Sequence, residues 1–278
     1  MLSIEYEYIN IKKIQLAYKK IGNGSKNILL FHGYGQDCHC WGKISGNLKE
    51  EYTFYCFDLV FHGKSSYDFT ENSLQNNQKN DLEIAFETFF GENNITDFSV
   101  LGFSLGARLA LFCVEIFPQN IQNIFLLAPD GIKNNFWFNL STRFWFSKIL
   151  FNAFLVNQSI FIKLGKMLTN IGLLDKSMLN FVTNQTNSIE KRQKIHNTWC
   201  FFANIPSISA KKILSKITKE SNSKEKFLSI FLAKNDIFIT EKTVKRNLQN
   251  IDFEIVTFDC NHFKLPLLLG DILNLKQI

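Results

Sequence analysis

The sequence predicts an α/β protein built on an eight-stranded, mostly parallel sheet that is flanked by helices and carries one inserted helical segment. Three observations lead to this prediction. Short apolar runs alternate with helical patterns, which is typical of strands joined by crossover helices. The 278 residues are 46% hydrophobic and 20% charged, a composition and length that can bury a large core. One long stretch, residues 131–205, has helical texture and no strand pattern.

The strands are expected at eight places. The first two runs are near-alternating and adjacent, so they predict an antiparallel hairpin, whereas the later runs are apolar throughout, as in buried parallel strands. In chain order the predicted strands are Ile4–Ile11, Ile14–Lys20, Asn27–His32, Tyr52–Asp58, Phe98–Phe103, Ile121–Ala128, Phe227–Ala233 and Phe253–Asp259.

Helices are expected between these strands. Leu82 to Phe90 follows helical spacing and is predicted to end at Gly91, and Leu105 to Phe117 is predicted to end before Pro118. Leu267 to Leu275 predicts a closing C-terminal helix. A loop of 75 residues without structure is improbable in a compact domain, so residues 131–205 predict a helical subdomain inserted into a core of residues 1–130 and 206–278.

The net charge of +6 is concentrated in this insertion. Residues 131–205 hold seven Lys and two Arg against Asp175 and Glu190. Nucleic-acid surfaces lean on Arg, yet only four of the 31 basic residues are Arg, so no nucleic-acid partner is expected. Three readings of the charge stay open: a solvated helical face, attraction of anionic substrates, or transient docking on an anionic membrane surface.

The rest of the composition indicates a cytoplasmic protein. The N-terminal residues lack the basic start and apolar core of a signal peptide, and no window reaches the roughly 20 apolar residues of a membrane span. Six cysteines without a secretory signal predict reduced thiols. Cys38-His39-Cys40 is too closely spaced for the usual zinc sites, so we expect neither a metal nor a cofactor.

The motif that carries chemistry is Gly102-Phe103-Ser104-Leu105-Gly106, which lies between a predicted buried strand and a predicted helix. In that context Ser104 occupies a sharp, strained turn with its hydroxyl exposed, and the helix N-terminus points free N–H groups at a developing oxyanion. His32-Gly33-Tyr34-Gly35 follows an earlier strand. We expect the N–H groups of Tyr34 and Leu105 to form the oxyanion hole together.

With these motifs the chain resembles the α/β-hydrolase superfamily over essentially its whole length. Asp58 to Ser65 also looks like the family's Asp-x-x-Gly-x-Gly-x-Ser loop, although Phe61 stands where the first glycine is common. The resemblance implies that the insertion is a helical cap after the sixth strand. It also implies a serine hydrolase that cleaves a carboxylic ester or thioester through an acyl-enzyme, with no cofactor.

A serine nucleophile needs a base and an orienting carboxylate. The resemblance puts the base at His262, after the last predicted strand. Two carboxylates compete for the third role. Asp236 ends the seventh predicted strand, where the family more often places its acid, and Asp130 ends the sixth, the position that some members use. We expect Asp236 to be the acid and keep Asp130 as the alternative, since triads are recognised by geometry.

The substrate is less well indicated. Aromatic residues crowd positions 136–154, and either an acyl-binding wall or the underside of a lid explains them. Arg108, four residues after Ser104, is similar to an Arg that binds substrate carboxylate in a lyase of menaquinone biosynthesis. The substrate-binding candidates are Arg108, Trp137, Phe138, Arg143 and Trp145. The alternatives to an ester hydrolase are therefore a carbon–carbon hydrolase or lyase on an anionic substrate, and a non-catalytic binding protein. The sequence does not indicate the oligomeric state.

Overall fold

The computed structural model describes residues 5–42, 44–69, 77–132, 158–170, 172, 176–219, 227–236 and 238–276. The chain divides into two compact units, one of residues 1–133 and 204–278 and the other of residues 134–203. The predicted boundaries of the insertion, 131 and 205, lie within three residues of this division.

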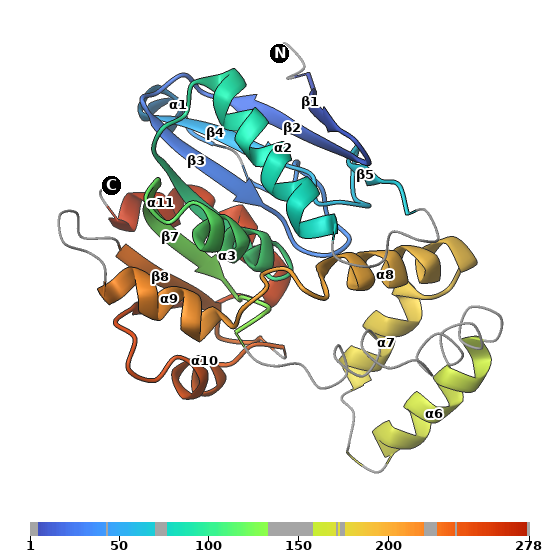
Figure 1. Ribbon diagram of the computed structural model, residues 1–278. Helices are drawn as coiled ribbons and strands as arrows, with labels where there is room; N and C mark the ends of the chain where they lie inside the picture. The colour runs from blue at the N-terminus through green and yellow to red at the C-terminus, as the bar shows by residue number, and fades with distance from the viewer. Residues whose placement is uncertain are drawn as a thin grey trace. The chain divides into compact units, whose positions relative to one another are not determined.

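Within the described residues, nine strands of the first unit form one mixed sheet in the order β1-β2-β4-β3-β6-β7-β8-β9, with β5 paired to β2 (Figure 1). The bounds are β1 Glu7–Ile11, β2 Ile14–Ile21, β3 Lys26–Phe31, β4 Tyr52–Phe57, β5 Ser66–Tyr67, β6 Phe98–Phe103, β7 Ile121–Leu127, β8 Phe227–Ala233 and β9 Glu254–Phe258. From β4 to β9 all neighbours are parallel, while β2 pairs antiparallel with β1, β4 and β5.

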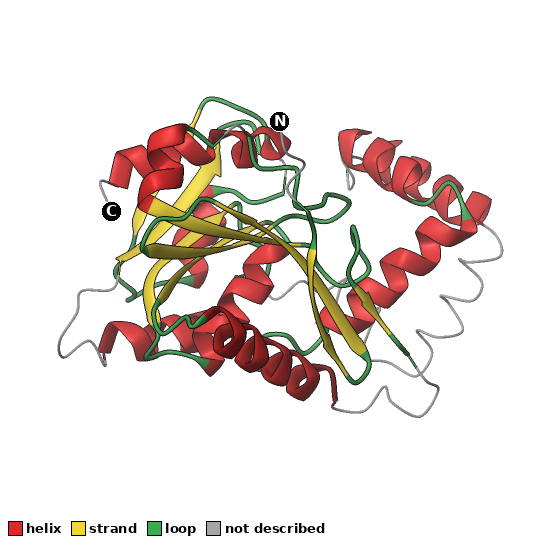
Figure 2. Cartoon of the chain, turned by 90° about the horizontal axis from the view of Figure 1, so that it is seen from above, coloured by secondary structure: helices red, strands yellow, loops and turns green. Residues whose placement is uncertain are grey.

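Helices cover both faces of this sheet, as the view from above shows (Figure 2). In the first unit they are α1 Gly46–Glu51, α2 Asn77–Asn93, α3 Gly106–Ile116, α9 Ala210–Lys219, α10 Glu241–Asn247, the 3-10 helix η1 His262–Leu268 and α11 Leu269–Lys276. Side chains of β3 alternate between the two layers. Leu30 joins the core of α1 and α11, whereas Phe31 meets Phe86 of α2. This alternation follows from the period of two along a strand.

The strand order places a topological switch point between β3 and β6. Along the chain, β3 is followed by β4 on one side of it, whereas β6 is followed by β7 on the other side, so the connections after β3 and β6 run in opposite directions. Open parallel sheets bind ligands at the carboxyl edge beside such a point. Ser104 follows β6 there, and His32 follows β3.

The second unit contains the described helices α6 Gln158–Asn170, α7 Lys176–Gln185 and α8 Ile189–Phe202. Ser188 caps α8 by accepting from the N–H of Lys191, and buried Arg192 donates from Nη1 to the carbonyl of Thr186 at 2.7 Å. No helix in the described part of the chain is long and apolar enough to cross a membrane.

The predicted fold class is confirmed, with two corrections. The sheet has one strand more than the eight expected, because β5 is two residues long and too short to show an alternating pattern. The helix predicted to end at Gly91 continues to Asn93. It ends where Asn94 takes a φ of +52° and the N–H of Ile95 bonds the carbonyl of Phe90, a left-handed C-terminal stop that Asn tolerates.

Candidate active site

Ser104 occupies the strained turn that the motif predicts. Its φ is +49°, in the left-handed region that a non-glycine residue enters only at a cost. Backbone hydrogen bonds hold it there: the Ser104 N–H donates to Leu127, and its carbonyl accepts from Ala107 at 3.0 Å. A Cβ on Gly102 would lie 2.6 Å from Ala107 Cα, so strand and helix can pass this closely only with glycine.

The loop after β3 lies against this turn. A Cβ on Gly33 would lie 2.8 Å from the ring of Phe103, and one on Gly106 would overlap the carbonyl oxygens of Phe31 and His32. Neither the Tyr34 N–H nor the Leu105 N–H donates a hydrogen bond to any group in the described ranges. Two backbone donors without an internal acceptor, on loops in close contact, are the parts from which an oxyanion site is built.

His32 holds the loop after β3 in place through hydrogen bonds at both of its ring nitrogens. Its Nε2 accepts from the Leu59 N–H at 3.0 Å, so the neutral ring carries its proton on Nδ1 and donates to the Gly33 carbonyl at 2.8 Å. The ring is fully buried and packs on His62, which in turn lies 5.2 Å from the ring of Tyr34. Burial raises the pKa of the Tyr34 hydroxyl to about 12, so that group is neutral at physiological pH.

His262 and Asp236 are joined by a short hydrogen bond of 2.7 Å between Nδ1 and Oδ2. The other carboxylate oxygen accepts from the N–H groups of Phe238 and Ile239, so the buried charge has three donors. The imidazole packs on the ring of Phe103, 4.9 Å away between centroids, which brings it beside the residue that precedes Ser104.

Three aromatic residues that the sequence analysis did not single out pack against this imidazole, namely Phe103, Phe238 and Phe263. Phe103 and Phe263 are adjacent in sequence to Ser104 and His262, and Phe238 lies two positions after Asp236. That closeness in sequence is the only signal that points to them.

Asp130, the alternative acid, has a different partner. Its Oδ2 accepts from Nε of Arg108 at 2.7 Å, and its Oδ1 accepts from the Gly131 N–H at 2.8 Å. Its own N–H donates to the carbonyl of Ser104. The structure therefore brings Asp236 to His262 and brings Asp130 to Arg108. The remaining substrate-binding candidates, Trp137, Phe138, Arg143 and Trp145, lie outside the described residues.

The Cys38-His39 segment lies near Asp37, with one potential ligand atom of each residue within 4.8 Å of the others. Hydrogen bonds account for this cluster. His39 Nδ1 lies 2.9 Å from the Asp37 carboxylate, and its Nε2 lies 3.0 Å from the ammonium of Lys19. Burial raises the pKa of the Cys38 thiol to about 12, and metal coordination needs a thiolate. The residues present do not fit a metal, because a cation beside the Lys19 charge is disfavoured.

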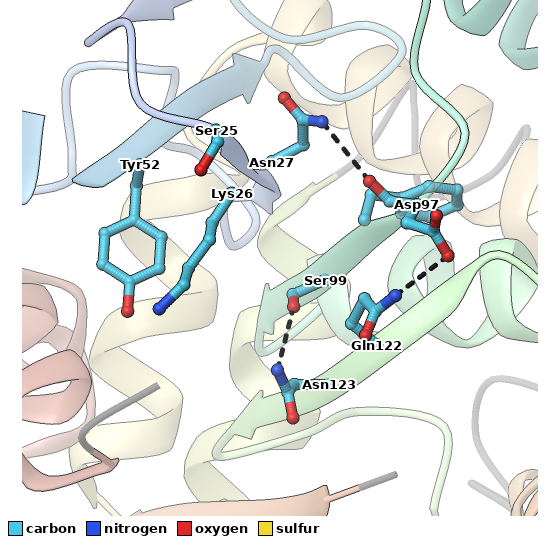
Figure 3. A pocket seen from close by; sticks show the side chains of 9 residues that line it. Ser25, Lys26, Asn27, Tyr52, Asp97, Ser99, Gln122 and Asn123 are labelled. Carbon is cyan, nitrogen blue, oxygen red and sulfur yellow. Dashed lines mark hydrogen bonds between the residues drawn. The ribbon is translucent and has the colours of Figure 1, made fainter. Parts of the chain in front are cut away.

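A polar pocket of about 230 Å³ lies at the amino ends of β3, β4, β6 and β7 (Figure 3). Ser104 follows the carboxyl end of β6, at the other edge of the sheet. Its side chains bond mainly to one another: Asn123 donates to Ser99 at 3.2 Å, and Gln122 donates to Asp97 at 2.9 Å. These side chains are hydrogen-bonded to one another, and they lie at the edge of the sheet remote from Ser104. We therefore assign this pocket no part in the chemistry.

A sequence model of the α/β hydrolase fold family matches residues 26–265, which is most of the chain. The chain belongs to the α/β-hydrolase fold family. Among curated proteins, an uncharacterised protein of Mycobacterium tuberculosis is 26% identical over 122 residues. That match covers 43% of this chain and 33% of the mycobacterial protein, so the chain spans about a third of that relative's length.

Several solved α/β-hydrolase structures share this fold. A putative epoxide hydrolase from Pseudomonas aeruginosa has 16% identity and a TM-score of 0.61, covering 99% of this chain and 95% of its own. A thermophilic esterase from Thermogutta terrifontis has 12% identity and a TM-score of 0.64, covering 98% and 97%. An enol-lactonase from Burkholderia xenovorans has 13% identity and a TM-score of 0.60, also covering 98% and 97%. At these identities the likeness concerns the fold alone.

Proposed function

We propose that this α/β hydrolase is a serine hydrolase that cleaves a carboxylic ester or thioester through an acyl-enzyme. Ser104 is the nucleophile, His262 the general base and Asp236 the orienting acid. The observation that carries the proposal is the 2.7 Å bond from His262 Nδ1 to Asp236, in a histidine whose ring packs beside the Ser104 turn. A buried His–carboxylate pair next to a strained serine is the arrangement that activates a hydroxyl.

The chemistry follows from these positions. Because Asp236 holds the proton on Nδ1, Nε2 of His262 is the atom left to accept the Ser104 proton as Oγ attacks the carbonyl. The negative charge that develops on the carbonyl oxygen is met by the N–H groups of Tyr34 and Leu105. His262 then gives its proton to the leaving alcohol or thiol. Water, deprotonated by His262, hydrolyses the acyl-enzyme and regenerates Ser104.

The elbow residue favours esters over epoxides. A serine that opened an epoxide would form an alkyl ether, which a histidine and water do not hydrolyse, whereas a serine acylated by an ester forms a hydrolysable acyl-enzyme. Arg108, the candidate for binding a substrate carboxylate, donates from its Nε to Asp130 within the protein.

We further propose that residues 131–205 form the cap of this enzyme and carry its acyl specificity. The separate unit of residues 134–203 and the helices α6, α7 and α8 support this proposal. The excess of basic residues in the same segment favours substrates with an anionic group.

A series of p-nitrophenyl esters and acyl thioesters of rising chain length tests the proposal. The wild-type protein is expected to turn over at least one class, and Ser104→Ala is expected to abolish that turnover. Ser99→Ala is the matched control, because Ser99 is a buried serine on β6, the strand that precedes Ser104, and lies outside the proposed site. Absence of turnover across the series, or activity that survives in Ser104→Ala, would contradict a serine hydrolase.

A further inference from the structure

Two strained stretches of backbone meet at the Ser104 turn. One is Ser104 itself, with φ +49°. The other lies just after β7, where Ala128 has a φ of +40°. Strained residues of this kind persist only where surrounding contacts hold them. The two stretches are joined by one hydrogen bond, 3.0 Å long, from the N–H of Asp130 to the carbonyl of Ser104.

The side chain of Asp130 is fixed on both oxygens. Gly131 donates its N–H to Oδ1 at 2.8 Å, and Arg108 donates from Nε to Oδ2 at 2.7 Å. Arg108 lies one helical turn after Ser104 on α3, and only 9% of its side chain is exposed. A charge-assisted bond in such a buried place is strong and directional. Arg108 therefore fixes Asp130, the residue whose backbone N–H donates to the carbonyl of Ser104.

We propose that Arg108 is a positioning residue for the nucleophile: acting through Asp130, it holds the Ser104 carbonyl and so sets the direction in which Ser104 Oγ points. The inference rests on the proposed role of Ser104. It also explains why an acidic residue at the end of β7 is present without a contact to His262. Asp130 is hydrogen-bonded both to Ser104 and to Gly131, the first residue of the segment 131–205.

The chain supplies a matched ion pair for comparison. Glu115, on the last turn of the same helix, accepts from Lys79 Nζ at 2.9 Å and from the N–H of Ser207 at 2.8 Å. Its side chain is also 9% exposed. Loss of either pair removes a charge-assisted contact of a side chain on α3 and is expected to cost stability. Only the Arg108 pair reaches the Ser104 turn, so only its loss is expected to change catalysis.

The test compares Arg108→Met and Arg108→Lys with Glu115→Gln. With p-nitrophenyl acetate, we expect Arg108→Met to lower kcat about 10- to 100-fold with KM within about twofold, because a misplacement on the order of 1 Å costs about 100-fold. Arg108→Lys, which keeps the charge, is expected to recover part of the loss and serves if the methionine variant does not fold. Glu115→Gln is expected to lower the melting temperature and to leave kcat within about twofold.

Amide hydrogen exchange supplies a readout that needs no activity. We expect the Asp130 N–H to be protected in the wild-type protein and to exchange at least about tenfold faster in Arg108→Met, with no such change in Glu115→Gln. If wild-type protein hydrolyses no ester, the proposed function fails while this measurement still decides the contact. Unchanged protection of Asp130, or a kcat in both Arg108 variants equal to that of Glu115→Gln, would overturn the positioning role.

Discussion

Replacing Gly106 by alanine tests whether the loop after β3 and the start of α3 must lie as close as they do. The added methyl group would overlap the carbonyl oxygens of Phe31 and His32 and would lie 2.5 Å from the carbonyl carbon of Phe31. An ordinary contact begins near 3.4 Å, so the backbone on one side has to move by about 1 Å. Rigid backbone atoms, unlike the end of a flexible side chain, cannot rotate away.

Gly106→Ala is expected to lower both the stability of the protein and its catalytic efficiency. Overpacking of this kind costs about 1 to 3 kcal/mol of stability. A shift of about 1 Å between the Tyr34 and Leu105 N–H groups opens the proposed oxyanion hole and is expected to lower kcat/KM about 100-fold. The stability cost alone leaves the protein folded at 25 °C if it has the usual margin of about 5 to 15 kcal/mol.

The assay is kcat/KM for p-nitrophenyl acetate at a temperature well below the measured melting point. Gly91→Ala is the matched control, because Gly91 lies inside α2 with nothing within 4 Å of an added Cβ. That change is expected to stabilise the helix by roughly 0.5 to 1 kcal/mol and to leave activity unchanged. A folded Gly106→Ala protein with wild-type kcat/KM would refute the reasoning about the oxyanion hole.

Two further predictions concern single side chains. Asp236→Asn is expected to lower kcat by roughly 10³- to 10⁴-fold in the ester assay, because His262 loses the carboxylate that holds its Nδ1 proton; a loss below tenfold would contradict the assigned acid. Burial raises the pKa of the Cys38 thiol from 9.0 to about 12, so above about pH 9 the folded state keeps a proton that the unfolded state loses, and stability falls as pH rises. Cys38→Ala removes this component, which is worth up to about tenfold in the folding equilibrium per pH unit, and equal pH slopes in urea unfolding of the two proteins would disagree with it.

Most of the sheet could be predicted from sequence because its strands are continuous apolar runs. Residues 98–103 and 121–127 are buried on both faces and read as strands without any tertiary information. β5 could not be predicted, since two residues form a strand only because β2 offers them a partner. Gly91 suggested a helix end from its residue type, but its position has open space, and the left-handed turn at Asn94 decides the end.

The sequence predicts that the candidate site residues follow the ends of strands, but it does not predict which of their side chains contact one another. Ser104 and His262 follow strands in the expected order, and the turn at Ser104, expected to be strained, has a φ of +49°. The sequence favours Asp236 as the acid without excluding Asp130, because each follows a strand and lies 26 residues from a candidate partner. What separates them is the contact of Asp130 with Arg108, a pairing across 22 residues that no local pattern encodes.

The most direct test of the central claim is covalent labelling of the wild-type protein with a fluorophosphonate probe, followed by mass spectrometry of the intact chain and of its peptides. A Ser104 activated by His262 and Asp236 predicts a single adduct, located on the peptide that contains Ser104 and lost in Ser104→Ala. An unlabelled protein, or an adduct that persists in Ser104→Ala, would contradict an activated serine at this site.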